Sequence, residues 1–292
     1  TVHPKGTLEK FKFRVEGDRA YGPGIYDMKG GAYLAYAAYR SLAEAGETTP
    51  LPLRFLYTSD EEIGSPTSRP FIEAQAKNAR YVLVMEPARD GGKVVTGRKG
   101  VARFSIKVEG RPAHSGTRHA DGRSAILEMA KHIIEIEGMT DYSRGITVNV
   151  GRIEGGTTVN TVPAHCWAAV DVRVPTVAAA DEIVSRLRSL KPKNPDTTVV
   201  VTGGLNRPPF EKNEGVAQLF EHARMIAKEI GIDLEDCYTG GGSDANFTAH
   251  LAPTLDGLGV DGAGAHTLEE HLLISSLVPR MQLLRRLFET LR

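Results

Sequence analysis

The stretch GRKGVARFSIKVEGRPAHSG (residues 97–116) decides the predicted fold, because the pattern of the chain changes within it. Apolar extended segments and helical segments alternate before it, whereas VARFSIKVEG alternates apolar and polar residues as a half-exposed strand does. A helical pattern follows, then GITVNVGRIEGG, HCWAAVDVRVP, a second helical pattern and TTVVVTGG. This order of strand, helix, strand, strand, helix and strand is the split β-α-β pattern of a ferredoxin-like unit.

The first helix of this unit is expected within DGRSAILEMAKHIIEIEG, residues 121–138. Asp121 is available as its N-terminal cap, and Gly138 as its stop. Its apolar residues at helical spacing predict one buried face, formed by Ile126, Leu127, Ala130, Ile133 and Ile134.

The sequence on either side of this unit predicts a second, discontinuous α/β domain. Residues 28–46 form a helical pattern, while residues 52–58 (PLRFLYT) and 81–85 (YVLVM) are apolar enough for buried strands. Two further helical patterns, from about Glu214 to Ile230 and through Leu277 to Leu291, return to the α/β character of the first hundred residues. We therefore expect one domain over residues 1–97 and 207–292, interrupted by an inserted domain over residues 98–206.

Composition excludes several classes of partner. The 36 Lys and Arg residues balance the 36 Asp and Glu residues, so no net field attracts nucleic acid or an anionic membrane. No apolar run approaches the roughly 18 residues of a membrane span. The cysteines Cys166 and Cys237 are far apart and predict ordinary buried thiols. We expect small-molecule partners, no nucleic acid and no membrane.

Four short segments place acidic or imidazole side chains in glycine-rich surroundings. They are YDMKGG with Asp27, TSDEEIGS with Glu61 and Glu62, MEP with Glu86, and GAGAHTLEEH with His266. The glutamates directly follow predicted apolar strands, and open α/β sheets bind ligands at the carboxyl ends of their strands. These segments are therefore candidates for one shared site.

Each segment also has an ordinary structural explanation. Asp27 could cap a helix, Glu61 and Glu62 could form a solvated turn, Glu86 could end a strand, and a single His266 in a loop is a ligand only in a minority of cases. None of the spacings is a compact zinc motif such as HExxH. The residues alone leave both interpretations open.

Taken together and in order, the motifs DMKGG, DEEIGS, MEP, GRPAHSG, TVNTVP, DVR, GGGSDAN and GAHTLEE span nearly the whole chain. This set resembles the co-catalytic zinc peptidases that include glutamate carboxypeptidase, acetylornithine deacetylase, succinyl-diaminopimelate desuccinylase and the aminoacylases, and it looks most like glutamate carboxypeptidase. The resemblance implies a mixed-sheet α/β catalytic domain with an inserted ferredoxin-like α+β lid, and a homodimer formed through that lid.

The resemblance also implies a role for each candidate residue. Asp27 would bridge two zinc ions, Glu62 and His266 would complete one ion's ligands, Glu86 would bind the second, and Glu61 would be the general base. Two divalent ions suit such a set because they lower the pKa of a shared water and polarise the scissile carbonyl. Two zinc ions are expected per intact subunit.

In the lid, the resemblance implies that His114 reaches the partner subunit's site and that Asn160 and Arg173 contact the substrate. A guanidinium suits a free carboxylate because it binds it in a bidentate manner. The competing interpretations are a turn residue for His114 and a strand-face salt pair of Arg173 with Asp171.

The loop GGGSDAN (residues 240–246) resembles the family loop beside the substrate, with Asp244 as a partner of the metal ligands. The implied substrate-binding residues there are Gly241, Gly242 and Ser243. Glycine lets backbone approach a ligand closely, although a plain tight turn is the alternative. Ser243 lacks the GxSxG arrangement of a nucleophile elbow, which argues against a serine hydrolase.

One family motif is incomplete. The family's first metal motif is Gly-His-x-Asp followed by Thr-Val, and this sequence starts at Thr1 and Val2, with His3 too far along to replace the missing ligand. We expect a truncated form of an active enzyme, with at most one tightly bound zinc and impaired activity, in preference to a naturally non-catalytic relative.

The resemblance implies a zinc-dependent exopeptidase that cleaves the amide bond to a C-terminal amino acid, with glutamate as the expected leaving residue. The alternatives are an N-acyl-amino-acid deacylase such as acetylornithine deacetylase and a non-catalytic dimeric relative. The expected substrate is a small peptide or an N-acyl amino acid. The compartment is not determined by the sequence, although the cytoplasm is favoured.

Overall fold

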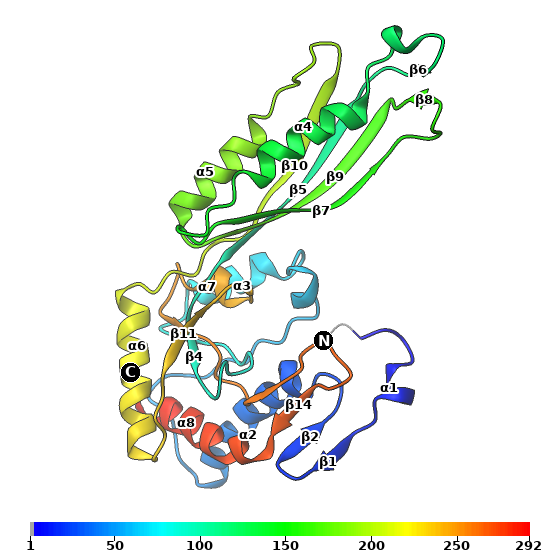
Figure 1. Ribbon diagram of the computed structural model, residues 1–292. Coiled ribbons are helices and arrows are strands. Elements are labelled where there is room, and N and C mark those ends of the chain that lie inside the picture. Colours follow the sequence, from blue (N-terminus) through cyan, green and yellow to red (C-terminus); the bar gives the residue numbers. More distant parts are fainter. Residues whose placement is uncertain (1–2) are drawn as a thin grey trace. The chain divides into compact units, whose positions relative to one another are not determined.

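The computed structural model describes residues 3–292 (Figure 1). It divides into two compact units, Thr1–Arg98 with Phe210–Arg292, and Lys99–Pro209. The boundaries predicted from the sequence, after residues 97 and 206, lie one and three residues before these. Thr1 and Val2, which match the end of the first metal motif, lie outside the described residues.

The inserted unit is a four-stranded antiparallel sheet in the order β10-β5-β9-β7. Its elements in chain order are β5 (Gly100–Glu109), α4 (Ala125–Glu137), β7 (Thr147–Gly155), β9 (His165–Val174), α5 (Val177–Arg188) and β10 (Thr198–Arg207). The first and third strands lie in the centre, which is the split β-α-β arrangement expected from the sequence. Both helices share one core with one face of the sheet (Figure 1).

Helix α4 corrects two details of the prediction. Its N-cap is Ser124, whose side chain accepts a hydrogen bond from the backbone N–H of Leu127, and Asp121 lies in a separate 3-10 turn, η3 (His119–Asp121). The expected face is also wrong. The buried residues are Ala125, Glu128, Met129, His132 and Ile136, whereas Leu127 and Ile134 are 59% and 76% exposed.

The buried face of α4 includes two polar residues, of which Glu128 binds the backbone of a neighbouring loop. The Glu128 carboxylate accepts backbone N–H groups of Lys193 and Asn194, and His132 lies one turn further along the helix. A pattern search for apolar residues therefore selects the wrong side of this helix.

The other unit contains short parallel strand pairs. β4 (Val94–Arg98) pairs with β11 (Asp236–Thr239), and β3 (Val82–Leu83) pairs with β12 (Thr254–Leu255). A bridge between Val95 and Asp256 joins the two pairs. A separate four-stranded sheet has the order β1-β2-β14-β13, formed by β1 (Arg14–Glu16), β2 (Arg19–Tyr21), β14 (His271–Leu273) and β13 (Gly262–Ala263).

Helices surround these strands and supply most of the core. The long ones are α2 (Gly30–Glu44), α6 (Glu214–Glu229) and α8 (Leu277–Thr290), and the short ones are α1 (Thr7–Lys10), α3 (Arg69–Ala76) and α7 (Ala245–Thr248). α2 packs against α8, with Leu34, Leu42 and Leu284 fully or almost fully buried in one cluster. Within the described residues, no helix is both long and apolar enough to cross a membrane.

The strand predicted over residues 52–58 is not formed. Among the described residues, no backbone hydrogen bond joins this segment to another one, and Phe55, Leu56 and Tyr57 are 38%, 39% and 66% exposed. A cavity of about 770 Å³ lies beside it, lined also by residues of β3, α3 and α8. An apolar pattern favours extended backbone, but a strand also needs a neighbour that supplies hydrogen-bond partners.

Candidate metal centre

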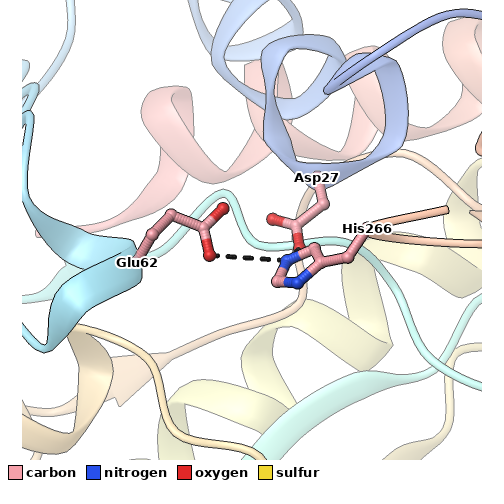
Figure 2. A group of neighbouring side chains, drawn as sticks. All are labelled: Asp27, Glu62 and His266. Carbon is pink, nitrogen blue, oxygen red and sulfur yellow. Dashed lines mark hydrogen bonds and ion pairs between the residues drawn. The ribbon is translucent and has the colours of Figure 1, made fainter. Parts of the chain in front are cut away.

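Three segments that are far apart in the sequence bring Asp27, Glu62 and His266 together (Figure 2). His266 Nε2 lies 3.1 Å from Asp27 Oδ2 and 3.4 Å from Glu62 Oε2. One potential ligand atom from each residue falls within 4.8 Å of the others. The side chains point toward one another, so these three predicted ligands form one cluster.

Asp27 lies in an irregular segment rather than at a helix cap. It belongs to η1 (Ile25–Lys29), where its φ of −116° and ψ of 94° are not helical. Helix α2 begins only at Gly30, and its N-cap position is Lys29, without a side-chain cap. The cap explanation for Asp27 is therefore wrong, and the side chain is directed toward the cluster instead (Figure 2).

A tight network fixes the loop that carries Glu61 and Glu62. These glutamates lie in η2 (Glu61–Ile63), directly after Asp60. The Asp60 carboxylate accepts hydrogen bonds from the hydroxyl and backbone N–H groups of both Ser68 and Thr67. These bonds, led by the Ser68 hydroxyl, hold the pKa of Asp60 well below its usual range. Asp60 thus anchors the loop, and the Glu62 side chain points toward Asp27 and His266 (Figure 2).

Glu86 lies close enough to the cluster to interact with it electrostatically. Its side chain is buried, and burial raises its pKa well above the usual range, with further contributions from the charges of Asp256, Asp27 and Glu61. Burial likewise raises the pKa of Asp27, helped by the neighbouring charge of Glu62. Carboxylates gathered this closely are stabilised in their charged form by a nearby cation.

A buried ion pair that the sequence analysis missed lies behind these carboxylates. Arg98 and Asp256 are both fully buried, and Arg98 Nε donates to Asp256 Oδ2 at 2.7 Å. Arg98 Nη1 donates to the carbonyl oxygen of Gly241 at 2.9 Å. The sequence held one signal for it, a charged residue at the end of the apolar strand VVTGR.

The same pair holds the glycine-rich loop. Ser243 is fully buried, and its hydroxyl donates to Asp256 Oδ2 at 2.6 Å and accepts from the backbone N–H of Ala245. The Ser243 hydroxyl therefore anchors the loop and is not presented to a ligand, contrary to the predicted substrate contact. Gly241 is exposed and Gly242 is half-buried, so their backbone remains accessible.

Asp244 connects this loop to the loop that carries the glutamates. Ser65 donates from its hydroxyl to Asp244 Oδ1 at 2.5 Å, and Thr58 donates to Asp244 Oδ2 at 3.3 Å. Asp244 thus binds the segments on both sides of Glu61 and Glu62 through Thr58 and Ser65.

In the inserted unit, His114 and Asn160 lie side by side. β6 (Ala113–His114) pairs with β8 (Thr161–Val162), and the backbone N–H of Ser115 donates to the carbonyl oxygen of Asn160 at 3.0 Å. His114 Nδ1 accepts the N–H groups of Gly116 and Thr117, each at 3.2 Å. In the neutral ring the proton is therefore on Nε2, which makes the exposed edge of His114 a donor.

Arg173 lies on β9 of the four-stranded sheet, at the opposite end of that strand from His165. It is aligned with Val101, whereas His165, at the start of β9, is aligned with Glu109. The strand rises about 26 Å between His165 and Arg173, at about 3.3 Å per residue. The Arg173 guanidinium binds the Asp171 carboxylate through Nε at 2.7 Å and Nη2 at 3.2 Å. The strand-face salt pair is therefore present, and Arg173 is not grouped with His114.

The cluster of Asp27, Glu62 and His266 fits a divalent metal. Ligand atoms at about 2.0–2.1 Å from a tetrahedral zinc lie about 3.3 Å apart, close to the 3.1 and 3.4 Å separations observed here. Two carboxylates and one imidazole are suitable zinc ligands, and three protein ligands is the number found in catalytic zinc sites that keep a fourth position open.

Comparisons with known proteins identify the family. The model of "Peptidase family M20/M25/M40" matches residues 1–290. The chain belongs to this family of peptidases. It is 34% identical to Carboxypeptidase G2 of Pseudomonas sp. (strain RS-16), over 96% of the chain and 69% of that protein. It is 28% identical to the succinyl-diaminopimelate desuccinylase of Dechloromonas aromatica (strain RCB), over 99% and 81%.

Solved structures of the family have the same architecture. Aminopeptidase PepT from Bacillus cereus ATCC 10987 matches with a TM-score of 0.78 and 26% identity, covering 95% of this chain and 75% of that one. An M20 family metallo-carboxypeptidase from Sulfolobus solfataricus matches with a TM-score of 0.69 and 17% identity, covering 98% and 82%. The family match and these structures confirm the predicted α/β fold and the hydrolase class, and the family is generally metal-dependent.

Proposed function

We propose that the protein is a zinc-dependent hydrolase that cleaves the amide bond to a C-terminal amino acid, in the manner of a glutamate carboxypeptidase. The observation that carries this proposal is the cluster of Asp27, Glu62 and His266, with Glu61 directly adjacent to one ligand. The similarity to Carboxypeptidase G2 supports the class of bond.

The proposed mechanism divides the work between neighbouring residues. Asp27, Glu62 and His266 would hold one zinc ion, and Glu86, whose charge interacts with that of Asp27, would be a ligand of a second. Bound zinc would supply Lewis-acid polarisation of the scissile carbonyl and would lower the pKa of water. Glu61 takes the proton from the attacking water and returns it to the leaving amine. The backbone of Gly241 and Gly242 lines the substrate side.

Metal binding tests the cluster directly. We expect the metal-free protein to bind Zn²⁺ at Asp27, Glu62 and His266. Loss of a residue that only orients a ligand typically weakens metal binding about 10- to 100-fold. Glu62→Gln should weaken zinc binding by more than this, because it removes a ligand itself. Isothermal titration with Zn²⁺ measures both. Glu73→Gln, on α3, is a control that should bind zinc normally. Equal zinc affinity in Glu62→Gln and the unchanged protein would contradict the assignment.

The competing function is removal of an acyl group from an amino acid, which the desuccinylase relative favours. The two reactions differ in the group on the carbonyl side of the bond, which is a peptidyl group in one and a simple acyl group in the other. A panel of N-succinyl and N-acetyl amino acids, compared with N-blocked peptides ending in glutamate, separates them. Preferential hydrolysis of the acyl amino acids would replace the carboxypeptidase proposal. No hydrolysis of either group by zinc-loaded protein would favour a non-catalytic relative.

We also propose that the inserted unit forms a homodimer in which His114 serves the partner's site. Leu127 and Ile134, one heptad apart on α4, leave an exposed apolar stripe, and α4 packs beside the edge strand β7. Such a stripe and sheet edge fit a second copy of the chain. The donor edge of His114 suits a developing oxyanion.

A mixing experiment tests the shared site. His114→Ala and Glu61→Gln chains, each impaired alone, should regain activity when mixed, because one of the two sites in a mixed dimer is intact. At equal amounts about half of the dimers are mixed, so about one quarter of all sites should be intact, measured as hydrolysis against the mixing ratio. The same mixture with Ile134→Lys in both chains should stay inactive and sediment as monomers. Recovery without dimers, or dimers without recovery, would contradict the shared site.

A further inference from the structure

Glu270 is a buried carboxylate that binds the backbone of the Asp27 segment. Its side chain is 0% exposed. Oε2 accepts the backbone N–H of Gly24 at 2.8 Å, and Oε1 accepts those of Tyr26 at 3.1 Å and Asp27 at 2.9 Å. His3 Nε2 also lies 3.2 Å from Oε2. One side chain therefore holds three backbone N–H groups of a single turn.

The position of Glu270 in the chain links two of the proposed ligands. It lies four residues after His266 and immediately before β14, which pairs with β2 at Tyr21. Its own carbonyl oxygen accepts the N–H of Gly22 at 3.2 Å. The backbone that leads out of the His266 loop is thus fixed, while its carboxylate fixes the turn that carries Asp27.

The Asp27 turn needs such a partner because its backbone is irregular. Asp27 and Met28 have non-helical φ and ψ, so the regular helical ladder does not satisfy the N–H groups before them. Tyr26 fixes the turn through a second contact, because its hydroxyl donates to the carbonyl oxygen of Ala88 at 2.7 Å. Hydrogen bonds to a charged acceptor are about twice as strong as neutral ones.

We propose that Glu270 is a positioning residue of the metal centre, which holds the Asp27 carboxylate in place relative to His266. This inference rests on the proposed function, since it requires that Asp27 binds metal. Partners that orient a ligand without touching the ion typically contribute about 10- to 100-fold to metal affinity. Glu270 acts through the backbone of Asp27 rather than through its carboxylate.

Zinc affinity of the Glu270→Gln variant tests this role. The amide keeps the shape of the side chain, but its NH₂ group faces backbone N–H donors and cannot accept from them. All three proposed ligands remain. We expect Zn²⁺ to bind about 10- to 100-fold more weakly, measured by isothermal titration of the metal-free protein, with an unchanged far-ultraviolet circular dichroism spectrum.

Two matched controls separate positioning from general stability. Glu269→Gln changes the adjacent, largely exposed glutamate, whose side chain is 77% exposed, and should bind zinc normally. Glu128→Gln changes a buried carboxylate of the other unit that also accepts backbone N–H groups. It should lower the melting temperature and leave zinc affinity unchanged. If Glu270→Gln does not fold, Glu270→Asp keeps the charge but shortens the reach, and should weaken zinc binding.

The outcomes distinguish this inference from the proposed function. If Glu62→Gln weakens zinc binding and folded Glu270→Gln or Glu270→Asp does not, the positioning role is overturned and the metal centre stands. If the unchanged protein binds no zinc at this cluster, the proposed function falls and the inference falls with it. An equal loss of affinity in Glu128→Gln would show that Glu270 acts only through stability.

Discussion

Glu61→Gln is expected to lower kcat by about 10² to 10⁴-fold while zinc remains bound, because the amide cannot accept the proton of the attacking water. Glu61 directly precedes Glu62 in η2, yet only Glu62 belongs to the three-residue cluster. Hydrolysis of an N-blocked peptide ending in glutamate gives kcat, and elemental analysis gives the zinc content.

Glu62→Gln serves as the comparison, since it should lose zinc and activity together. The two variants make the same chemical change at adjacent positions, so a difference in zinc content assigns the ligand. Near-normal turnover by zinc-loaded Glu61→Gln would refute its role as the base. Loss of zinc from Glu61→Gln would instead make it a ligand.

Arg98→Met is expected to lower the free energy of unfolding by about 3–5 kcal/mol, because it leaves the Asp256 carboxylate buried without its partner. The carbonyl of Gly241 would lose a donor as well. Ser243→Ala, which removes one hydroxyl from the same network, should cost only about 1 kcal/mol. Urea unfolding followed by far-ultraviolet circular dichroism measures both.

The double variant Arg98→Met, Asp256→Leu provides the decisive comparison. Replacing both charges with apolar side chains removes the unpaired carboxylate, so much of the lost stability should return. A double variant that is less stable than Arg98→Met alone would show that Asp256 stabilises the fold through its other partners, Ser243 and Gly257, even without Arg98.

Much of the architecture could be predicted because local pattern and tertiary structure agree. The alternating strand 101–110 and the helix starting at Glu214 appear as β5 and α6, where Asn213 caps the helix by accepting from the N–H of Val216. The segments with Asp27, Glu62 and His266 also converge as expected. The strand expected before Glu61 and Glu62 is not formed, so the resemblance of the motifs, and not a shared strand edge, predicted this convergence.

Other features depend on partners that no local pattern reveals. Ser243 resembles a substrate contact in the sequence, but Asp256 takes its hydroxyl into the interior. Glu270 looks like one of two equivalent acidic residues, and only the fold shows that it meets the Asp27 turn whereas Glu269 is largely exposed. Sequence gives the residue types of a site, whereas tertiary contacts decide which of them bind a ligand and which hold the others.

The extended segment 52–58 has a consequence for how this chain behaves in concentrated solution. Its peptide groups lack backbone partners among the described residues, and aromatic and aliphatic side chains are exposed along it. Unpaired N–H and C=O groups along an extended segment can pair with a strand of another molecule, and aggregates grow at sheet edges through such pairing. Arg54 is the only charged residue within the seven. The tendency of this chain to precipitate during refolding or storage should therefore begin at this segment.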